Sequence, residues 1–484
     1  MGIVAKQTSQ NILTIGIAFM FGGINTLVFY PAFLSAEAYG LVVFLLATSN
    51  LLMPLIGFGI HQTIIRYYSS YQNMEMQQRF MNSVILLPLL IAFLIGGICI
   101  AFYHSIVNSL SMKNPIIADY TWVIFVVAIA TAYFEVFYAW ARVQLQSVLG
   151  NVLKEIYPRL FLFLLLITLY FFELSFDQFI IILVIGYFIR LLLMILLANH
   201  YYQVRIRLHF PSNIRSIFIY SATILLAAFA GSLIIDIDKF MIPQLQEIKQ
   251  TAFYAIAIFA ATLVEVPARA MQQILNPLVA TAVNENNPKE VNNLYKKSAL
   301  NLVVVSGWFF LLVNLNSEAL FSLLPDVGYQ TATTVVLYIS LAKLLMMIFG
   351  CGSAIISNSS FYQITLVFSI LMAFGVTLLN VIWIPLYGID GAALATLVVI
   401  GSSILLKMAY LYYKINAHPF SWNMCKTLIV VGILFVVFDS FDFTVSPILQ
   451  IVLTSALVSV FYFTIVVQFK LSNDLIRLLH RVIK

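Results

Sequence analysis

The residues of this chain that could do chemistry are charged side chains inside long apolar stretches. Glu265 and Arg269 stand four residues apart within 250–277, so on a helix they lie one turn apart and can form an ion pair. Gln272 and Asn276 continue the same face. Because an ionised side chain at mid-membrane costs about 2.5 to 3.5 kcal/mol on the insertion scale, we expect this face to contact a cavity or a partner. The alternative is an internal salt bridge that only fixes packing.

Other charged residues lie at similar depth in the predicted membrane spans. Arg190 and Lys343 are near mid-span, where a long side chain cannot reach the surface, and Glu135 is equally deep. Arg159 and Lys407 are nearer the span ends and can act as anchors. A Glu135–Arg190 pair between adjacent helices is a structural alternative to a functional role. Because deep bases outnumber deep acids, the sequence favours a cavity that attracts anions and repels organic cations.

A further polar group, Asp236, Asp238 and Lys239, stands at the end of the seventh predicted span in the sequence DIDKF. Asp-x-Asp is a pattern by which many glycosyltransferases hold a metal with a nucleotide sugar, so an enzyme has to be considered. Its predicted position on the outer face, away from cytoplasmic nucleotide sugars, argues against that activity. We expect a gating contact or a coupling-ion site, with a plain surface cap as the alternative.

The surrounding chain is strongly apolar. It has 484 residues, of which 62% are hydrophobic and 9% charged, and no soluble class of protein has this composition. Unbroken runs such as LFLFLLLITLYFF are unlike the alternating strands of a β-barrel. The predicted fold class is therefore an all-α polytopic membrane protein. The three cysteines and six histidines have no paired or metal-ligand spacing, so we predict neither disulfides nor a metal site.

A window of membrane-spanning length predicts about 14 transmembrane helices. The even number puts both termini on one side of the membrane. Boundaries are set by the loss of hydropathy at each end. The predicted spans are 10–34, 39–62, 80–104, 118–142, 151–172, 177–201, 213–236, 250–276, 297–323, 329–356, 360–386, 390–413, 424–440 and 446–469.

The loops between these spans differ in charge. Most Lys and Arg residues fall in one alternate set, which includes both termini, and the other set holds mainly acids such as Glu37, Glu173 and Asp390. The positive-inside rule makes the basic set cytoplasmic, so both termini are predicted to be inside. The basic stretch at 201–215 separates the first six helices from the next six. The predicted division is an N-terminal lobe 1–208, a C-terminal lobe 209–416, and 417–484 with two helices and a cytoplasmic tail.

Several stretches of the chain resemble one protein family. They are SAEAYGLVVFLLATSNLLMPLIGFGIHQTIIRYY at 35–68, PLYGIDGAALATL at 385–397, and Asp236 to Phe240 followed by Tyr254 and VPARAMQQILNPLVA. These are similar to segments of the Wzx-type polysaccharide and O-antigen flippases of the multidrug/oligosaccharidyl-lipid/polysaccharide (MOP) exporter superfamily. The resemblance implies two six-helix lobes around a central cationic cavity, two further C-terminal helices, and transport by alternating access.

The resemblance also implies roles for individual residues. In the cationic cavity, the substrate-binding candidates are Arg269, Lys343 and Arg190. The candidates for coupling or gating are Glu265, Glu135, Asp236, Asp238 and Lys239.

The first predicted span departs from a related group of flippases. The segment ILTIGIAFMFGGINTLVFYPAFL contains no Arg or Lys, unlike the first span of the lipid-linked peptidoglycan precursor flippases that look related. That difference argues against the peptidoglycan precursor as substrate. Asn25, Thr26 and Tyr30 are the candidates for contacts with a sugar instead.

The expected function is a monomeric flippase of the bacterial inner membrane. It would move an undecaprenyl-diphosphate-linked oligosaccharide to the outer leaflet for O-antigen lipopolysaccharide, capsule or exopolysaccharide synthesis. Membrane lipid, a polysaccharide polymerase and a chain-length regulator are the implied partners, with no nucleic acid and no enzymatic activity. No resident cofactor is expected, and proton or sodium coupling is left open. The alternatives are a cation-coupled multidrug exporter, which predicts an acid-dominated cavity, and a membrane polysaccharide polymerase, which predicts a large outer loop.

Overall fold

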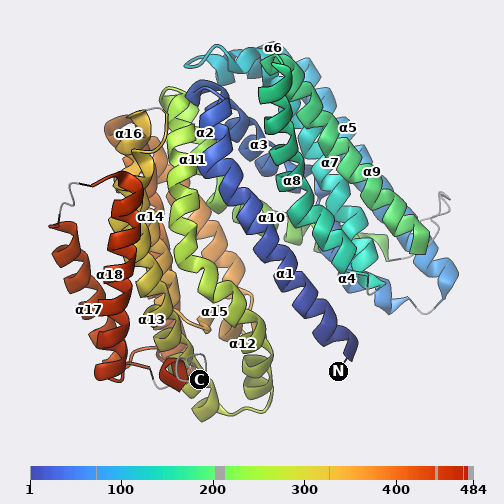
Figure 1. Cartoon of the computed structure of the whole chain (residues 1–484). Coiled ribbons are helices and arrows are strands. Elements are labelled where there is room, and N and C mark those ends of the chain that lie inside the picture. The colour runs from blue at the N-terminus through green and yellow to red at the C-terminus, as the bar shows by residue number, and fades with distance from the viewer. Residues whose placement is uncertain are drawn as a thin grey trace. The chain divides into compact units, whose positions relative to one another are not determined.

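The computed structural model describes residues 2–71, 73–144, 146–201, 213–325, 327–441, 445–472 and 474–477. In this part the regular structure is entirely helical (Figure 1). Thirteen of the described helices are long and apolar enough to cross a membrane. The predicted class, an all-α polytopic membrane protein, is confirmed.

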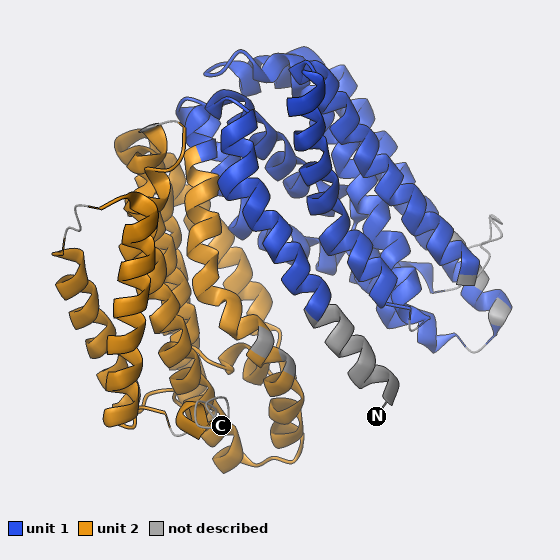
Figure 2. Cartoon of the chain, viewed as in Figure 1, with its two compact units in different colours: residues 1–252 blue, residues 253–484 orange. Residues whose placement is uncertain are grey.

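The chain forms two compact units, residues 1–252 and 253–484 (Figure 2). The predicted lobes 1–208, 209–416 and 417–484 follow the order of membrane spans and stay a prediction. The first unit contains α1 (Gly2–Ile24), η1 (Asn25–Phe29), α2 (Tyr30–Phe33), α3 (Ala36–Gly57), α4 (Ile60–Tyr67), η2 (Tyr68–Ser70), α5 (Met74–Ala101), α6 (Tyr103–Ser111), α7 (Ile117–Val143), α8 (Val148–Phe172), α9 (Phe176–Tyr201), α10 (Ile214–Leu245) and the start of α11 (Lys249–Thr262).

The second unit contains the remainder of α11 and the helices that follow it. Its other elements are η3 (Leu263–Glu265), α12 (Val266–Asn284), α13 (Pro288–Phe321), η4 (Val327–Ala332), α14 (Thr333–Ile348), α15 (Gly352–Asn358), α16 (Ile364–Ile415), α17 (Trp422–Asp439) and α18 (Pro447–Gln468).

One central helix organises each unit. In the first unit α7 packs against α3, α4 and α9, and its small residues let α3 approach closely: a Cβ placed on Gly57 would lie 3.8 Å from Ala132. In the second unit α13 packs against α12, α14, α17 and α18. The Tyr462 hydroxyl of α18 donates a 2.6 Å hydrogen bond to the Val304 carbonyl, and Trp308 Nε1 donates to Ser459 Oγ at 2.9 Å. Hydrogen bonds between helices therefore supplement apolar packing in the second unit.

The longest helix, α16, contains two of the predicted spans. As a straight rod its 52 residues would measure about 78 Å, more than twice the apolar thickness of a bilayer. Gly388 interrupts it with φ 60° and ψ −136°. A Cβ on Gly391 would lie only 2.2 Å from the Trp383 carbonyl oxygen, so the chain folds back on itself here. The two arms correspond to the predicted spans 360–386 and 390–413, which reconciles thirteen described helices with about 14 crossings.

Several other predicted spans are interrupted where the sequence suggested continuity, including two that contain candidate site residues. The predicted span 329–356 is divided among η4, α14 and α15, with a break at Gly350, whose φ is +51°. A Cβ at this glycine would lie 2.7 Å from Ser298 Oγ, and that hydroxyl accepts a 3.0 Å hydrogen bond from the Cys351 backbone nitrogen. In the predicted span 10–34, the five residues of η1 form a π-helical segment. Interrupted helices within membrane proteins often line binding sites.

Candidate functional site

Glu265 lies at a change of helix type. α11 ends at Thr262, η3 forms one 3₁₀ turn, and α12 begins at Val266. Pro267 lies in the first turn of α12, where a backbone N–H has no partner within the helix and its loss costs little. The 3₁₀ turn directly before this proline is a local change in helix geometry, of the kind that a proline favours. The turn packs against α13 and α14, which brings Glu265 within reach of a second cation.

One carboxylate holds two cations in the second unit. Lys343 Nζ lies 2.5 Å from Glu265 Oε2, and Arg269 Nε lies 3.6 Å from Glu265 Oε1. The side chains of Glu265 and Lys343 are 20% and 21% exposed, whereas that of Arg269 is 48% exposed. One negative and two positive charges leave a formal charge of +1 on this group, the Glu265 cluster. Lys343 is held tightly and Arg269 loosely, so Arg269 is the cation more available to an incoming anion.

Arg190 in the first unit lies in different surroundings. Arg190 is 6% exposed, and its guanidinium carbon lies 3.8 Å from the centroid of the Phe134 ring. Its Nε has no hydrogen-bond partner, and no ion pair joins it to an acid in the described part of the chain. A cation over an aromatic face is stabilised by about 2 kcal/mol or more when desolvated.

The structural alternative of a Glu135–Arg190 pair does not occur among the ion pairs of the described residues. Glu135 instead pairs with Lys154 of α8, with 2.7 Å between Nζ and Oε1. Neighbouring side chains on α7 point about 100° apart, so Phe134 meets Arg190 of α9 while Glu135 meets α8. The sequence interpretation did not consider Lys154, which lies in the first turn of the predicted span 151–172, as a partner.

The Asp236 group lies inside a helix rather than at its end. α10 continues to Leu245, beyond the predicted limit at residue 236. Lys239 Nζ lies 2.5 Å from Asp236 Oδ1, and both Asp236 and Asp238 are buried. The pair neutralises one of the two carboxylates locally. A role for this group in gating or coupling stays a prediction.

The predicted sugar contacts of the first span lie in or beside the π-helical segment. Asn25 is 3% exposed and its Nδ2 donates a 2.7 Å hydrogen bond to the Arg159 carbonyl, while its Oδ1 has no hydrogen-bond partner. Thr26 is half-buried. Tyr30 is buried and stacks on Tyr39 with 4.4 Å between ring centroids. These contacts lie within the first unit, and a role in sugar binding stays a prediction.

A polar pocket of about 300 Å³ lies between α12 and α15 in the second unit. The sequence had identified Gln272 and Asn276 as continuing the face of Glu265 and Arg269. It missed the residues after Gly350, because it interpreted 329–356 as one continuous span; the Gly350-Cys351-Gly352 triplet was the available signal. The polar side chains that line the pocket are Gln272, Asn276, Ser353, Ser357 and Asn358.

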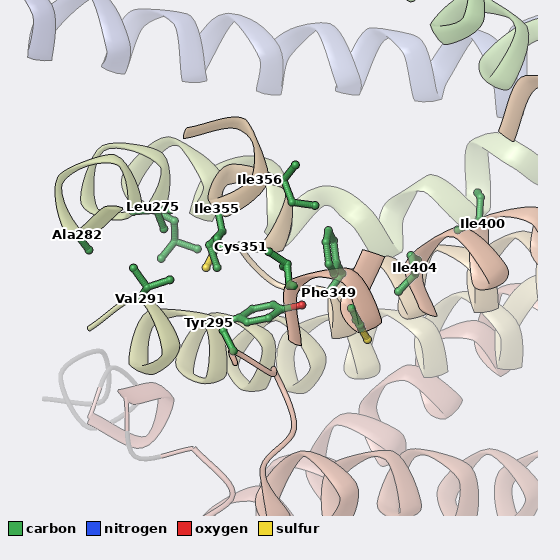
Figure 3. Close-up of a cluster of buried hydrophobic side chains, with 14 of the residues drawn as sticks. Leu275, Ala282, Val291, Tyr295, Phe349, Cys351, Ile355, Ile356, Ile400 and Ile404 are labelled. Atoms are coloured by element: carbon green, nitrogen blue, oxygen red, sulfur yellow. The ribbon is translucent and has the colours of Figure 1, made fainter. Parts of the chain in front are cut away.

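The apolar wall of this pocket is the surface of the protein core. Leu275 and Cys351 line the pocket and also belong to a buried cluster with Tyr295, Phe349 and Ile355 (Figure 3). The cluster joins α12, α13, α14 and α15. The polar side chains of the pocket therefore belong to α12 and α15, two helices that pack against this core.

Comparison with known proteins identifies the family. Residues 4–284, more than half of the chain, match the polysaccharide biosynthesis protein family. The chain belongs to this family. No curated protein sequence matches it.

Solved structures with the same fold are transporters of the MOP superfamily. The chain is 12% identical to the lipid II flippase MurJ in an inward closed conformation, with a TM-score of 0.67 over 95% of this chain and 99% of that one. It is 14% identical to an inward-facing multidrug resistance MATE transporter, with a TM-score of 0.62 over 84% of this chain and 94% of that one. A MOP superfamily transporter from Pyrococcus furiosus, described as having a binding pocket of reverse polarity, is 13% identical, with a TM-score of 0.53 over 84% of this chain and 95% of that one. At these identities the matches establish the fold, which is the fold that the resemblance to the MOP exporters implied.

Proposed function

We propose that this polysaccharide biosynthesis protein is a flippase for an undecaprenyl-diphosphate-linked glycan repeat unit. It carries the repeat from the inner to the outer leaflet of the bacterial inner membrane for synthesis of a surface polysaccharide such as O-antigen, capsule or exopolysaccharide. The family match and the transporter fold support transport in polysaccharide synthesis. The asymmetry of basic residues between alternate loops supports cytoplasmic termini.

The observation that carries the proposal is the Glu265 cluster, in which one carboxylate is shared by two cations. A diphosphate offers several acceptor oxygens, and Arg presents a forked set of donors while Lys presents a point charge. In our proposal the diphosphate first binds the exposed Arg269, whose contact with Glu265 is long, and then competes for Lys343. Glu265 neutralises part of the charge when no substrate is bound.

This exchange of partners also links binding to movement. A ligand shifts a conformational equilibrium only if it binds the two states unequally. When the substrate replaces Glu265 as the partner of Arg269, it stabilises a state in which the ion pair between Arg269 of α12 and Glu265 is broken. Arg190 is a second cation for the same class of group, because no carboxylate in the described chain pairs with it. Glu135, Asp236 and Asp238 remain the proposed sites of proton or sodium coupling.

The proposal is tested by surface-polysaccharide display in cells that lack the chromosomal gene. We expect Arg269→Ala and Lys343→Ala each to reduce display about tenfold, since each removes a charged contact worth about 1.5 to 3 kcal/mol. Arg79→Ala is the matched control, because Arg79 forms an exposed pair with Glu75. Full display by folded, inserted Arg269→Ala and Lys343→Ala proteins contradicts the proposal. A second arm tests for the polymerase and chain-length regulator as partners by co-purification.

A multidrug exporter is the second candidate, supported by the shared fold with the MATE transporter. That function predicts a cavity dominated by acids, whereas the Glu265 cluster has one acid and two bases. Overexpression that raises resistance to cationic dyes, without an effect on surface polysaccharide, would favour the exporter.

A further inference from the structure

We infer that the polar pocket between α12 and α15 is a subsite for uncharged sugar residues of the transported glycan. The inference rests on the proposed function and adds a location for the part of the substrate beyond its diphosphate. No charged side chain is among the described residues that line this pocket. The group that fits here is therefore neutral and rich in hydrogen-bonding atoms.

The pocket has unused hydrogen-bonding capacity. Within the described chain, the side chains of Gln272, Asn276 and Ser353 make no hydrogen bond. Each amide offers both an oxygen acceptor and two N–H donors, and a hydroxyl both donates and accepts. Ring hydroxyls of a sugar also donate and accept, so the two sets are complementary. Ser357 and Asn358 use their hydrogen-bond donors on the backbone of α15 and keep oxygen acceptors for a ligand.

The pocket also has an apolar side. Leu275, Cys351 and Ala354 line this side, and all three belong to the buried apolar cluster or pack against it. A sugar ring has apolar C–H faces as well as hydroxyls, and binding sites for small molecules combine apolar walls with a few placed polar groups. The volume of about 300 Å³ is at the lower end of the range for such sites, which fits one or two rings rather than a whole repeat unit.

The position of the pocket relative to the Glu265 cluster matches the order of groups in the substrate. Asn276 follows Arg269 by seven residues on α12, and Gly350 follows Lys343 by seven residues just past α14. Each of these two segments therefore runs from the Glu265 cluster to the pocket over about 10 Å. The first sugar of a diphosphate-linked glycan is bonded directly to the terminal phosphate, so sugars must lie beside the anion site.

A second cavity in the first unit does not have this chemistry. It has about 370 Å³ and is lined mainly by apolar and aromatic side chains, including Leu51, Trp122 and Phe240. Such a surface suits lipid chains rather than hydroxyl groups. The amide and hydroxyl lining is a property of the α12–α15 pocket.

Calorimetric titration of the purified protein with two probes tests the inference. The probes are farnesyl diphosphate and farnesyl diphosphate bonded to N-acetylglucosamine. We expect the wild-type protein to bind the glycosylated probe about tenfold more tightly, a difference of about 1.4 kcal/mol, because the sugar hydroxyls form hydrogen bonds with the pocket amides. Gln272→Leu/Asn276→Leu is expected to bind both probes equally and to keep the affinity for farnesyl diphosphate. The matched control Gln450→Leu, on α18 outside the pocket, keeps the tenfold difference.

The outcomes separate the inference from the proposed function. Equal affinity of the wild-type protein for both probes, or a tenfold difference that persists in Gln272→Leu/Asn276→Leu, overturns the sugar subsite while binding of farnesyl diphosphate upholds the anion site. Failure of the wild-type protein to bind either probe overturns both. Loss of the tenfold difference when phosphatidylglycerol is added assigns the pocket to a polar lipid headgroup and also overturns the inference. Ser353→Thr, which keeps the hydroxyl, is a conservative variant expected to retain sugar binding.

Discussion

Arg190 in the first unit and the Glu265 cluster in the second unit accommodate positive charge in opposite ways. In the second unit Lys343 and Arg269 share Glu265, whereas in the first unit Arg190 lies over the Phe134 ring with no carboxylate in the described chain paired to it. A shared carboxylate makes each cation depend on the other two groups of the cluster. A cation over an aromatic ring depends only on local packing.

This difference predicts which substitutions change stability and which change mainly transport. Removing one member of an ion pair leaves an uncompensated charge, whereas replacing an unpaired buried cation with an apolar residue removes a desolvation cost. The Glu265 cluster should therefore affect both folding and transport, and Arg190 mainly transport. Substitutions at four positions test this distinction.

The largest effect is expected for Glu265→Gln. The neutral amide leaves Lys343 and Arg269 facing each other without a counter-charge, which should lower the free energy of unfolding by about 3 kcal/mol. Thermal unfolding of the purified protein in detergent measures the change. The double substitution Glu265→Gln/Lys343→Met should recover part of the loss, because it removes one of the repelling charges. An unchanged Tm in Glu265→Gln would show that the carboxylate does not stabilise the cluster.

A smaller and unequal pair of effects is expected for the two cations of the cluster. Lys343→Met removes the 2.5 Å contact between half-buried groups and should cost about 2 kcal/mol of stability. Arg269→Gln removes a 3.6 Å contact of a side chain that is 48% exposed and should cost less than about 1 kcal/mol. The comparison is made by denaturation under identical conditions. Equal losses would contradict the assignment of Lys343 as the tightly held partner.

The smallest effect on stability is expected for Arg190→Met. The apolar replacement loses the contact with the Phe134 ring but also loses the cost of a buried guanidinium, so Tm should stay within about 2 °C of the wild-type value or rise. Surface-polysaccharide display should nevertheless fall. A Tm decrease as large as that of Glu265→Gln would remove the distinction between Arg190 and the Glu265 cluster.

Much of the fold could be predicted from the length of the apolar runs. Spans of about 20 apolar residues require little tertiary information, and the two arms of α16 were predicted as separate crossings on either side of Gly388. The breaks at Gly350 and in η1 could not be predicted in the same way. They depend on contacts with distant segments, such as that between Gly350 and Ser298, which local hydropathy does not contain.

The candidate site was predictable only along a single helix. Glu265 and Arg269 follow from their four-residue spacing, but the arrival of Lys343 at the same carboxylate depends on the packing of η3 against α14. Glu135 shows the same limit, because its partner depends on which neighbouring helix its side of α7 faces. Depth in a span indicates that a charge needs a partner, and only the tertiary fold decides which one.

The most direct test of the account follows a fluorescent undecaprenyl-diphosphate-linked glycan between the leaflets of proteoliposomes. We predict that wild-type protein and Arg79→Ala equilibrate the lipid between leaflets, whereas Arg269→Ala/Lys343→Ala, inserted to the same level, leaves it in the leaflet where it was placed. Transfer by the double variant at the wild-type rate would contradict the claim that the cations around Glu265 bind the diphosphate.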